Sequence, residues 1–226
     1  MPEVVFENES YVGKSLSPGE EAILARQIPT FLVAPGSFYE WLLRSNWDKV
    51  RGAAMIAKDK LGAPITGISA ADSEIGFQKI RSGHIRRTTG TTETADNNWS
   101  QDFTAGNDYY VGYSTNLTTA VNIDKDALVL VLGAMFTQGQ QPVVEELYPQ
   151  IGGTIYPVVV LRDSWVADND FGVRGGPIRP LIAVPKATAL WQTRETLAGT
   201  NELVLLGITF GMGRYLRQQS YSSIST

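Results

Sequence analysis

The chain has 226 residues, with 19 Lys and Arg against 23 Asp and Glu, which gives a formal net charge of −4. It contains no Cys and a single His, so disulfides, thiolate metal sites, iron–sulfur clusters, cysteine nucleophiles and two-histidine metal sites are all excluded. A chain of this length forms one large domain, or a smaller domain with a substantial arm.

The first 16 residues show no helical periodicity and have no strand partner nearby in the sequence, so we expect an extended arm. They also lack the basic and apolar regions of a secretory signal, which predicts synthesis in the cytosol. Arms of this kind are ordered mainly by packing against another surface. We therefore assign residues 1–46 as an N-terminal arm, and its large apolar side chains are candidates for contacts between subunits: Val4, Val5, Phe6, Tyr11, Phe38 and Trp41.

Two capping signatures predict short helices within this arm. Ser17 is followed by Pro18 and Glu20, the pattern of a capping box, which predicts a helix over 20–27. Pro29 should end that helix, because the residue before a proline disfavours the helical region. Ser37 has a Glu three residues later, and this second signature predicts a helix that ends near residues 45–46.

Two interpretations compete for residues 47–68. The small and apolar residues recur at helical spacing, whereas the apolar runs on either side of Lys58–Gly62 fit a β-hairpin. The hairpin is favoured, because Gly52 would weaken a helix interior by about 1 kcal/mol and residues 64–68 resemble a return strand.

The fold class predicted for residues 47–217 is mainly β, an antiparallel β-sandwich or jelly roll. Gly and Pro number 22 and 11, and they recur between short apolar runs from Tyr109 onward. No repeat of fixed period is visible, which argues against propellers and solenoids. Residues 81–107 are rich in Thr, Gly, Asn and Asp and predict a long polar loop, and residues 218–226 predict a polar tail.

Some of these runs are apolar without alternation, notably residues 128–132 and 203–210. A strand with one face in water should alternate, and no helical segments lie between these strands to serve as parallel crossovers. Both faces of these strands must therefore be covered. We expect one face to pack on the opposing sheet and the other on the N-terminal helices or on neighbouring subunits.

The chain has one basic cluster, formed by Lys79, Arg81, Arg86 and Arg87 with His84 between them. Such a cluster contacts the phosphates of packaged nucleic acid or an acidic neighbour, or it is simply a solvated loop. Because the net charge is negative and Phe77 is the only adjacent aromatic residue, sequence-specific nucleic-acid binding is not expected.

Two other classes of function stay open at this stage. Five Trp and nine Tyr residues permit a carbohydrate-binding surface, although large aromatic residues also dominate the cores of β-sandwiches. A carboxylate-based glycan-active enzyme would need two acidic residues brought together from distant positions, and no pair stands out. We assign no catalytic residue, metal ligand or cofactor, and we expect the chain not to be an enzyme.

The segment from Pro180 to Arg217 carries a resemblance. It contains an apolar strand bearing a proline, a polar strand, a Gly-Thr-Asn-Glu turn and a final Leu-rich strand, in that order. Over residues 107–217 this order resembles the small jelly-roll structural proteins of phages and other icosahedral viruses. The resemblance implies a capsid, cement or head-associated protein, or a receptor-binding module of a phage tail.

From the same resemblance we expect a particular location and set of partners. The protein would be made in the host cytoplasm and built into the virion. Its partners would be copies of itself and other virion proteins, it would contact no membrane, and any contact with nucleic acid would be nonspecific.

Overall fold

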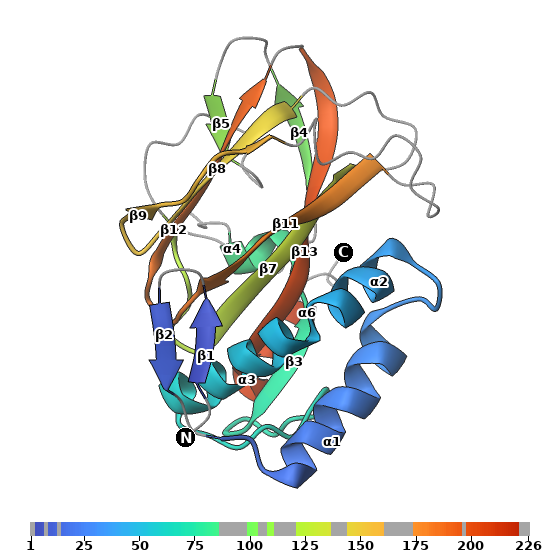
Figure 1. Ribbon diagram of the computed structural model, residues 1–226, viewed down its shortest axis with the longest axis vertical. Coiled ribbons are helices and arrows are strands. Elements are labelled where there is room, and N and C mark those ends of the chain that lie inside the picture. Colours follow the sequence, from blue (N-terminus) through green and yellow to red (C-terminus); the bar gives the residue numbers. More distant parts are fainter. Residues whose placement is uncertain are drawn as a thin grey trace.

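The computed structural model describes residues 3–6, 9–12, 15–85, 99–103, 108–110, 121–136, 144–160, 174–195 and 198–221. The chain is mainly β, with two antiparallel sheets and a group of helices near the N-terminus (Figure 1). This confirms the predicted β-sandwich. No helix in the described ranges is long and apolar enough to cross a membrane.

The helices and strands follow one another in a simple order. The N-terminal part contains β1 (Glu3–Phe6), β2 (Glu9–Val12), α1 (Pro18–Gln27), the π-helical turn η1 (Ile28–Leu32), α2 (Phe38–Ser45) and α3 (Trp47–Leu61). The body contains β3 (Ile75–Lys79), α4 (Ser82–Ile85), β4 (Ser100–Phe103), β5 (Asp108–Tyr110), β6 (Val121–Asn122), β7 (Ala127–Phe136), β8 (Val144–Ile151), β9 (Thr154–Ile155), β10 (Val159–Val160), β11 (Arg174–Ala183), β12 (Thr188–Glu195), β13 (Gly199–Met212) and α6 (Gly213–Tyr221).

Two sheets form the sandwich, and we name them by their position. The inner sheet has the order β11-β7-β13-β3, with β4 paired to the first residues of β13. The outer sheet has the order β10-β8-β12-β5, with β6 and β9 attached to β12 and β8. In Figure 1 the helices α1, α2 and α3 lie against the lower part of the inner sheet, and we call them, together with η1, the helical layer.

The inner sheet is buried on both faces, as the unbroken apolar runs predicted. In β7, Val129 and Val131 belong to the core between the two sheets, whereas Leu128, Leu130 and Leu132 belong to the core beneath the helical layer. Successive side chains of a strand point to opposite faces, so one run of apolar residues fills two cores. The cover on the second face comes from this chain's own helices, so neighbouring subunits are not needed to provide it.

The two predicted capping signatures both form. The Ser17 hydroxyl accepts from the Glu20 N–H and the Glu20 carboxylate accepts from the Ser17 N–H at 2.7 Å, which completes the capping box of α1. The Ser37 hydroxyl accepts from the Glu40 N–H at 3.2 Å and begins α2. After Pro29 the chain continues as η1 before it reaches α2.

The predicted hairpin over residues 47–68 is wrong, because residues 47–61 form the helix α3. Its alanines, Ala53, Ala54 and Ala57, are fully buried beneath the helical layer. Ala has the highest helix propensity, and its small side chain lets a helix lie close to a sheet. Gly62 ends the helix in the left-handed region at φ 70°, rather than turning a hairpin.

The predicted loop and tail also contain regular structure. The range 81–107 includes α4 and β4, while its residues 86–98 and 104–107 lie outside the described part of the chain. The first residues of the predicted tail belong to α6, which follows β13 directly. Residues 222–226 lie outside the described part.

Candidate functional site

The strand β3 forms part of one edge of the inner sheet, and this edge is incompletely covered. Towards the sheet, β3 pairs with residues 208–212 of β13, and the Ile80 N–H donates to the Gly207 carbonyl at 3.3 Å. On the outer side, the Ile75 N–H donates to the Pro64 carbonyl at 2.9 Å, and the Thr66 N–H donates to the Ile75 carbonyl. Residues 64–66 therefore cover the outer edge of β3 at its start.

Beyond Ile75 the outer edge of β3 has no strand partner among the described residues; Lys79 is exposed there, whereas Phe77 is only 2% exposed. Alternate residues of a strand direct their N–H and C=O groups to the same edge, so those of Phe77 and Lys79 point outward, as those of Ile75 do. Within the described ranges, no backbone hydrogen bond reaches the N–H of either residue. On β13, β3 pairs with residues 208–212 and β4 with residues 199–202, which leaves residues 203–206 without a strand partner on this side among the described strands, although Leu203 and Leu205 are buried.

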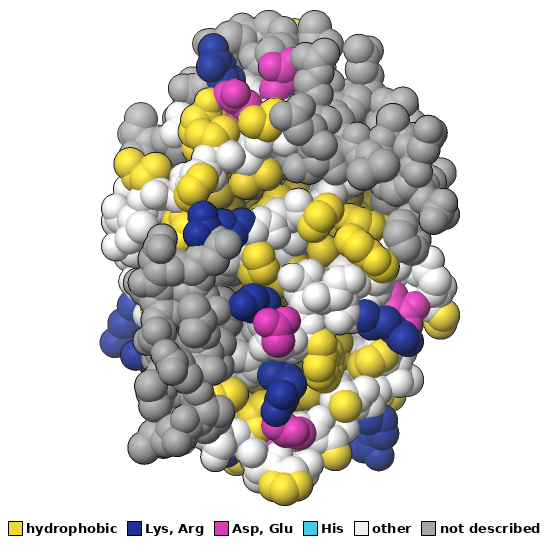
Figure 2. Space-filling model, viewed as in Figure 1, with side chains coloured by type: hydrophobic (Ala, Val, Ile, Leu, Met, Phe, Trp, Pro, Cys, Tyr) yellow, Lys and Arg dark blue, Asp and Glu magenta, His cyan; other side chains and the backbone are white. Residues whose placement is uncertain are grey.

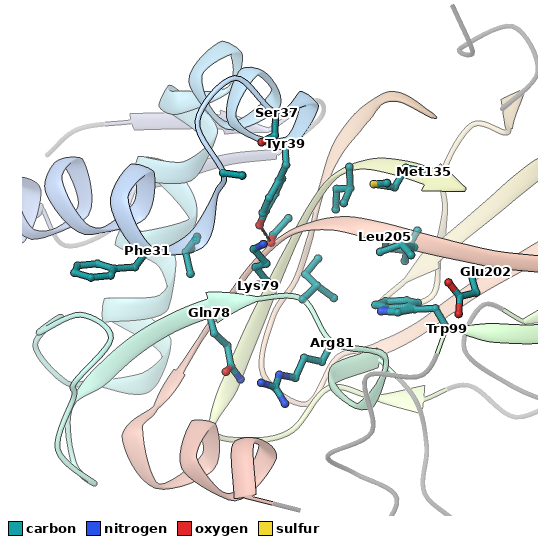
Figure 3. A pocket seen from close by; sticks show the side chains of 16 residues that line it. Phe31, Ser37, Tyr39, Gln78, Lys79, Arg81, Trp99, Met135, Glu202 and Leu205 are labelled. Carbon is teal, nitrogen blue, oxygen red and sulfur yellow. Dashed lines mark hydrogen bonds between the residues drawn. The ribbon is translucent and has the colours of Figure 1, made fainter. Parts of the chain in front are cut away.

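Two adjoining hollows follow this open edge, with volumes of about 630 Å³ and about 350 Å³. They share Phe31, Leu32 and Gln78, so they form one surface feature, which we call the edge groove. Figure 3 shows the larger hollow, with Phe31 of η1 and Tyr39 of α2 on one side and Trp99 and Glu202 on another. The smaller hollow reaches Ile68 and, on α6, Leu216 and Arg217.

The groove has apolar walls and basic groups. Phe31 is 59% exposed and Ile68 is 44% exposed, which is unusual for side chains of their size. The ammonium of Lys79 lies 5.4 Å from the centre of the Tyr39 ring, and no carboxylate in the described part of the chain pairs with it. Arg81 lines the larger hollow, and Arg217, which is paired with Asp72, lines the smaller one.

Tyr39 fixes the junction between α2 and the edge groove. Its hydroxyl donates to the Gly207 carbonyl, which also accepts from the Ile80 N–H. Burial raises the pKa of Tyr39 above its ordinary value, so the phenol stays protonated and keeps donating. The ring is thereby held in place beneath the Lys79 ammonium, which is a favourable cation–π position.

The basic cluster predicted from the sequence is only partly seen. Lys79 and Arg81 lie together at the end of β3, where both line the larger hollow, while Arg86 and Arg87 fall outside the described residues. His84 does not belong to this surface. It is buried in α4, and its Nδ1 accepts from the Arg81 N–H at 3.1 Å.

The predicted subunit-contact residues lie in different structural environments. Phe38 is buried within the helical layer, where its ring stacks on Trp41 at 5.6 Å between ring centres. Trp41 is 42% exposed. Val4, Val5, Phe6 and Tyr11 lie in β1 and β2, which pair with each other, and β1 also contacts α3.

The open edge itself was missed in the sequence. The apolar pattern of residues 75–79 does not distinguish an edge strand with one free side from a central strand, since the edge depends on which segment pairs there. A partial signal was present, because Lys79 is charged and charged residues are common on exposed edges.

Metal-binding and sugar-binding sites were considered among the described residues as well. No group of three or more His, Cys, Asp or Glu side chains is placed to hold a metal ion within these residues. Trp99 and Trp191 are 6% and 2% exposed, so neither offers a face for stacking on a sugar. Comparisons with protein-family models, with curated proteins and with solved structures gave no match for this chain.

Proposed function

We propose that this chain is a structural subunit of a symmetric assembly, and that the assembly is a virion shell to which it belongs as a capsid, cement or head-associated protein. The observation that carries the proposal is the presence of large exposed apolar side chains on two opposite layers. One set lies on and beside the helical layer: Phe31, Trp41 and Ile68. The other lies at β9 and β10 of the outer sheet: Ile155, Val158 and Val160.

Two separate apolar surfaces suit a subunit that contacts neighbours through different faces. Exposed apolar patches on soluble chains commonly mark contacts with other proteins, and two non-equivalent patches allow rings or closed shells to form. Figure 2 shows one face of the molecule, on which apolar side chains lie between scattered charged ones. The jelly-roll resemblance of residues 107–217 supports the more specific virion role.

The burial of the inner-sheet strands, by contrast, does not require assembly. The helical layer covers the second face of the inner sheet, so the strands do not need a neighbouring subunit to be buried. The proposal therefore depends on the exposed patches and on the resemblance.

The test measures assembly directly. Size-exclusion chromatography with light scattering at about 10–100 μM should show oligomers, and negative-stain electron microscopy should show regular rings, trimers or shells. Replacing Phe31 and Trp41 by Ser should shift the protein towards monomer, whereas Ser in place of exposed Arg26 on α1 should not. A purified wild-type chain that stays monomeric at 100 μM would contradict the proposal.

A further inference from the structure

We propose that the edge groove is the docking site for the β1–β2 hairpin of a second copy of this chain. The inference rests on the proposed function, because it assigns one contact of the assembly to named residues. It states that the hairpin adds to the open edge of β3 and so extends the inner sheet of one subunit into the next.

The first support is the hydrogen-bonding capacity of the open edge. The outward N–H and C=O groups of Phe77 and Lys79 find no strand partner in the described chain. Unpaired edge groups are a template for strand addition, in which main-chain hydrogen bonds provide affinity and side-chain pockets provide specificity. The edge groove supplies such pockets on both sides of β3, from Phe31 on the helical layer to Leu216 on α6.

The second support is the form of the proposed occupant. β1 and β2 are strands of four residues each, and they pair only with each other among the described strands. Each strand of such a two-stranded sheet therefore keeps one edge free. An isolated hairpin is marginally stable in water, so pairing with a larger sheet would stabilise it.

The third support is charge complementarity. The first 14 residues contain Glu3, Glu7 and Glu9 against a single basic side chain, Lys14, and are therefore acidic. The larger hollow of the groove is lined by two basic residues and one acidic residue: Lys79, which has no acidic partner in the described part of the chain, Arg81 and Glu202. The hairpin also contains Val4, Val5, Phe6 and Tyr11, whose apolar character suits walls lined by Phe31, Leu32 and Ile68.

A charge-swap experiment on the full-length chain tests the proposal. One variant carries Lys79→Glu and Arg81→Glu, and a second carries Glu3→Lys and Glu9→Lys. Each variant alone places like charges at the contact, so its association should weaken at least tenfold in sedimentation velocity measurements. An equimolar mixture should associate again, because the acidic hairpin of the first variant meets the basic groove of the second and the reverse contact is also matched.

A matched control separates this contact from a general effect of charge. Arg26→Glu with Lys60→Glu makes the same change of net charge on α1 and α3, and neither residue lines the groove. This variant should associate like the wild type. Circular dichroism melting curves identify any variant that fails to fold, and the mixture provides a second readout, since restored association requires two folded partners.

Hydrogen exchange tests the geometry. The amides of Phe77 and Lys79 should exchange at least tenfold more slowly in the assembly than in the charge-reversed variants. Association that survives all the charge reversals, with unchanged exchange at these two amides, would overturn the docking proposal and leave the proposed function standing.

A peptide-binding experiment tests the docking site even if the chain does not assemble. If the wild-type chain is monomeric, the proposed function fails, but a synthetic peptide of residues 1–14 can still be titrated against it. Slower exchange at Phe77 and Lys79 with this peptide, and not with a peptide carrying Val5→Pro, would support the groove as a site for strand addition. The absence of any effect would overturn it.

Discussion

At the scale of single residues, His84 is a buried base whose contacts select its neutral form. Its Nδ1 accepts from the Arg81 N–H at 3.1 Å and lies 2.7 Å from the Thr209 hydroxyl. Burial, with a smaller contribution from the charge of Arg81, lowers the pKa of His84 to about 3. Tyr215 of α6 packs beside the ring, at 5.9 Å between ring centres. A proton on Nδ1 would remove an acceptor that the backbone uses.

This arrangement predicts a specific loss of stability in mild acid. Because the unfolded chain binds a proton near pH 6.5 and the folded chain does not, the free energy of unfolding should fall by about 1.4 kcal/mol per pH unit below pH 6.5. Urea unfolding at pH 7.5, 6.5 and 5.5 measures this slope. His84→Asn keeps an acceptor near the Nδ1 position and does not titrate, so its slope should be close to zero over this range, and an unchanged slope would contradict the assignment.

Glu20 is a second residue whose role depends on its surroundings. Its carboxylate accepts from the Lys58 ammonium at 2.7 Å, from the Ser17 N–H at 2.7 Å and from the Ile65 N–H at 3.1 Å. Although burial raises the pKa of Glu20, these hydrogen bonds outweigh it and lower the pKa to about 2. One side chain thus joins α1, α3 and the segment that covers the start of β3.

Replacing Glu20 by Ala should cost about 2–3 kcal/mol of unfolding free energy, since it removes three charge-assisted hydrogen bonds and leaves the buried Ile65 N–H without its partner. Glu21→Ala is the matched control, because Glu21 is 44% exposed in its ion pair with Arg51 and should contribute less than about 1 kcal/mol. Denaturant unfolding at pH 7 compares the two variants. The stability due to Glu20 should be lost as the pH falls below 4.5, where the unfolded carboxylate becomes protonated while the folded one remains charged.

At the scale of elements, a β-bulge in β7 changes which residues of the strand face each of the two cores. The pairing of β13 with β7 shifts between Leu206 and Gly207, where Gly133 and Val131 are the partners and Leu132 is skipped. Before the bulge, Val129 and Val131 face the core between the sheets, and after it Ala134 and Phe136 do so. The extra residue therefore shifts the alternation by one position, so that even-numbered instead of odd-numbered residues face the core between the sheets after the bulge.

Gly133 lies at this bulge, and a larger side chain there should clash with its neighbours. A Cβ at this position would lie 2.8 Å from Leu42 Cδ2 of α2 and 2.9 Å from the Gly176 carbonyl of β11. Gly133→Ala should therefore destabilise the chain by about 1–3 kcal/mol through displacement of backbone or helix. Gly19→Ala on α1, where the nearest atom is 3.9 Å away, should be neutral or slightly stabilising. Equal melting temperatures for the two variants would contradict this account of the helix–sheet contact.

Local patterns in the sequence predict some of these elements and not others. The caps at Ser17 and Ser37 were predictable because a cap is a local interaction between residues three apart. The double burial of residues 128–132 was also predictable, since its signal is the absence of alternation. The helix α3 was missed because a penalty of about 1 kcal/mol for one glycine was given more weight than the helical spacing of five apolar residues.

The edge groove could not be derived from the sequence in the same way. It arises where β3 and β4 both pair with β13 and leave residues 203–207 between them, and strand pairing at such separations depends on the complete fold. Lys79 and Arg81 were identified as a basic site, but Phe31 and Ile68 were not, because isolated apolar residues in a sequence do not reveal which of them stay exposed.

At the scale of the whole molecule, the helical layer belongs to the core, although the sequence suggested an arm for residues 1–46. Removing residues 1–61 would expose Leu128, Leu130, Leu206, Ile208 and Phe210, all of which are buried beneath the helices. Such a truncated chain should aggregate or bind the dye ANS strongly. A chain lacking only residues 1–14 should keep its melting temperature within a few degrees, and a soluble, dye-free product from the larger deletion would refute this view.

The position of β13 in the inner sheet also affects synthesis. This strand lies between β7 and β3, yet its residues 199–212 follow both of them in the chain. Before β13 is synthesised, the strand that pairs with both β7 and β3 is missing. The helices α1, α2 and α3 then lack part of the sheet surface against which they pack. Nascent chains should therefore expose apolar surface until β13 has been synthesised, and chaperones that shield such intermediates should assist folding.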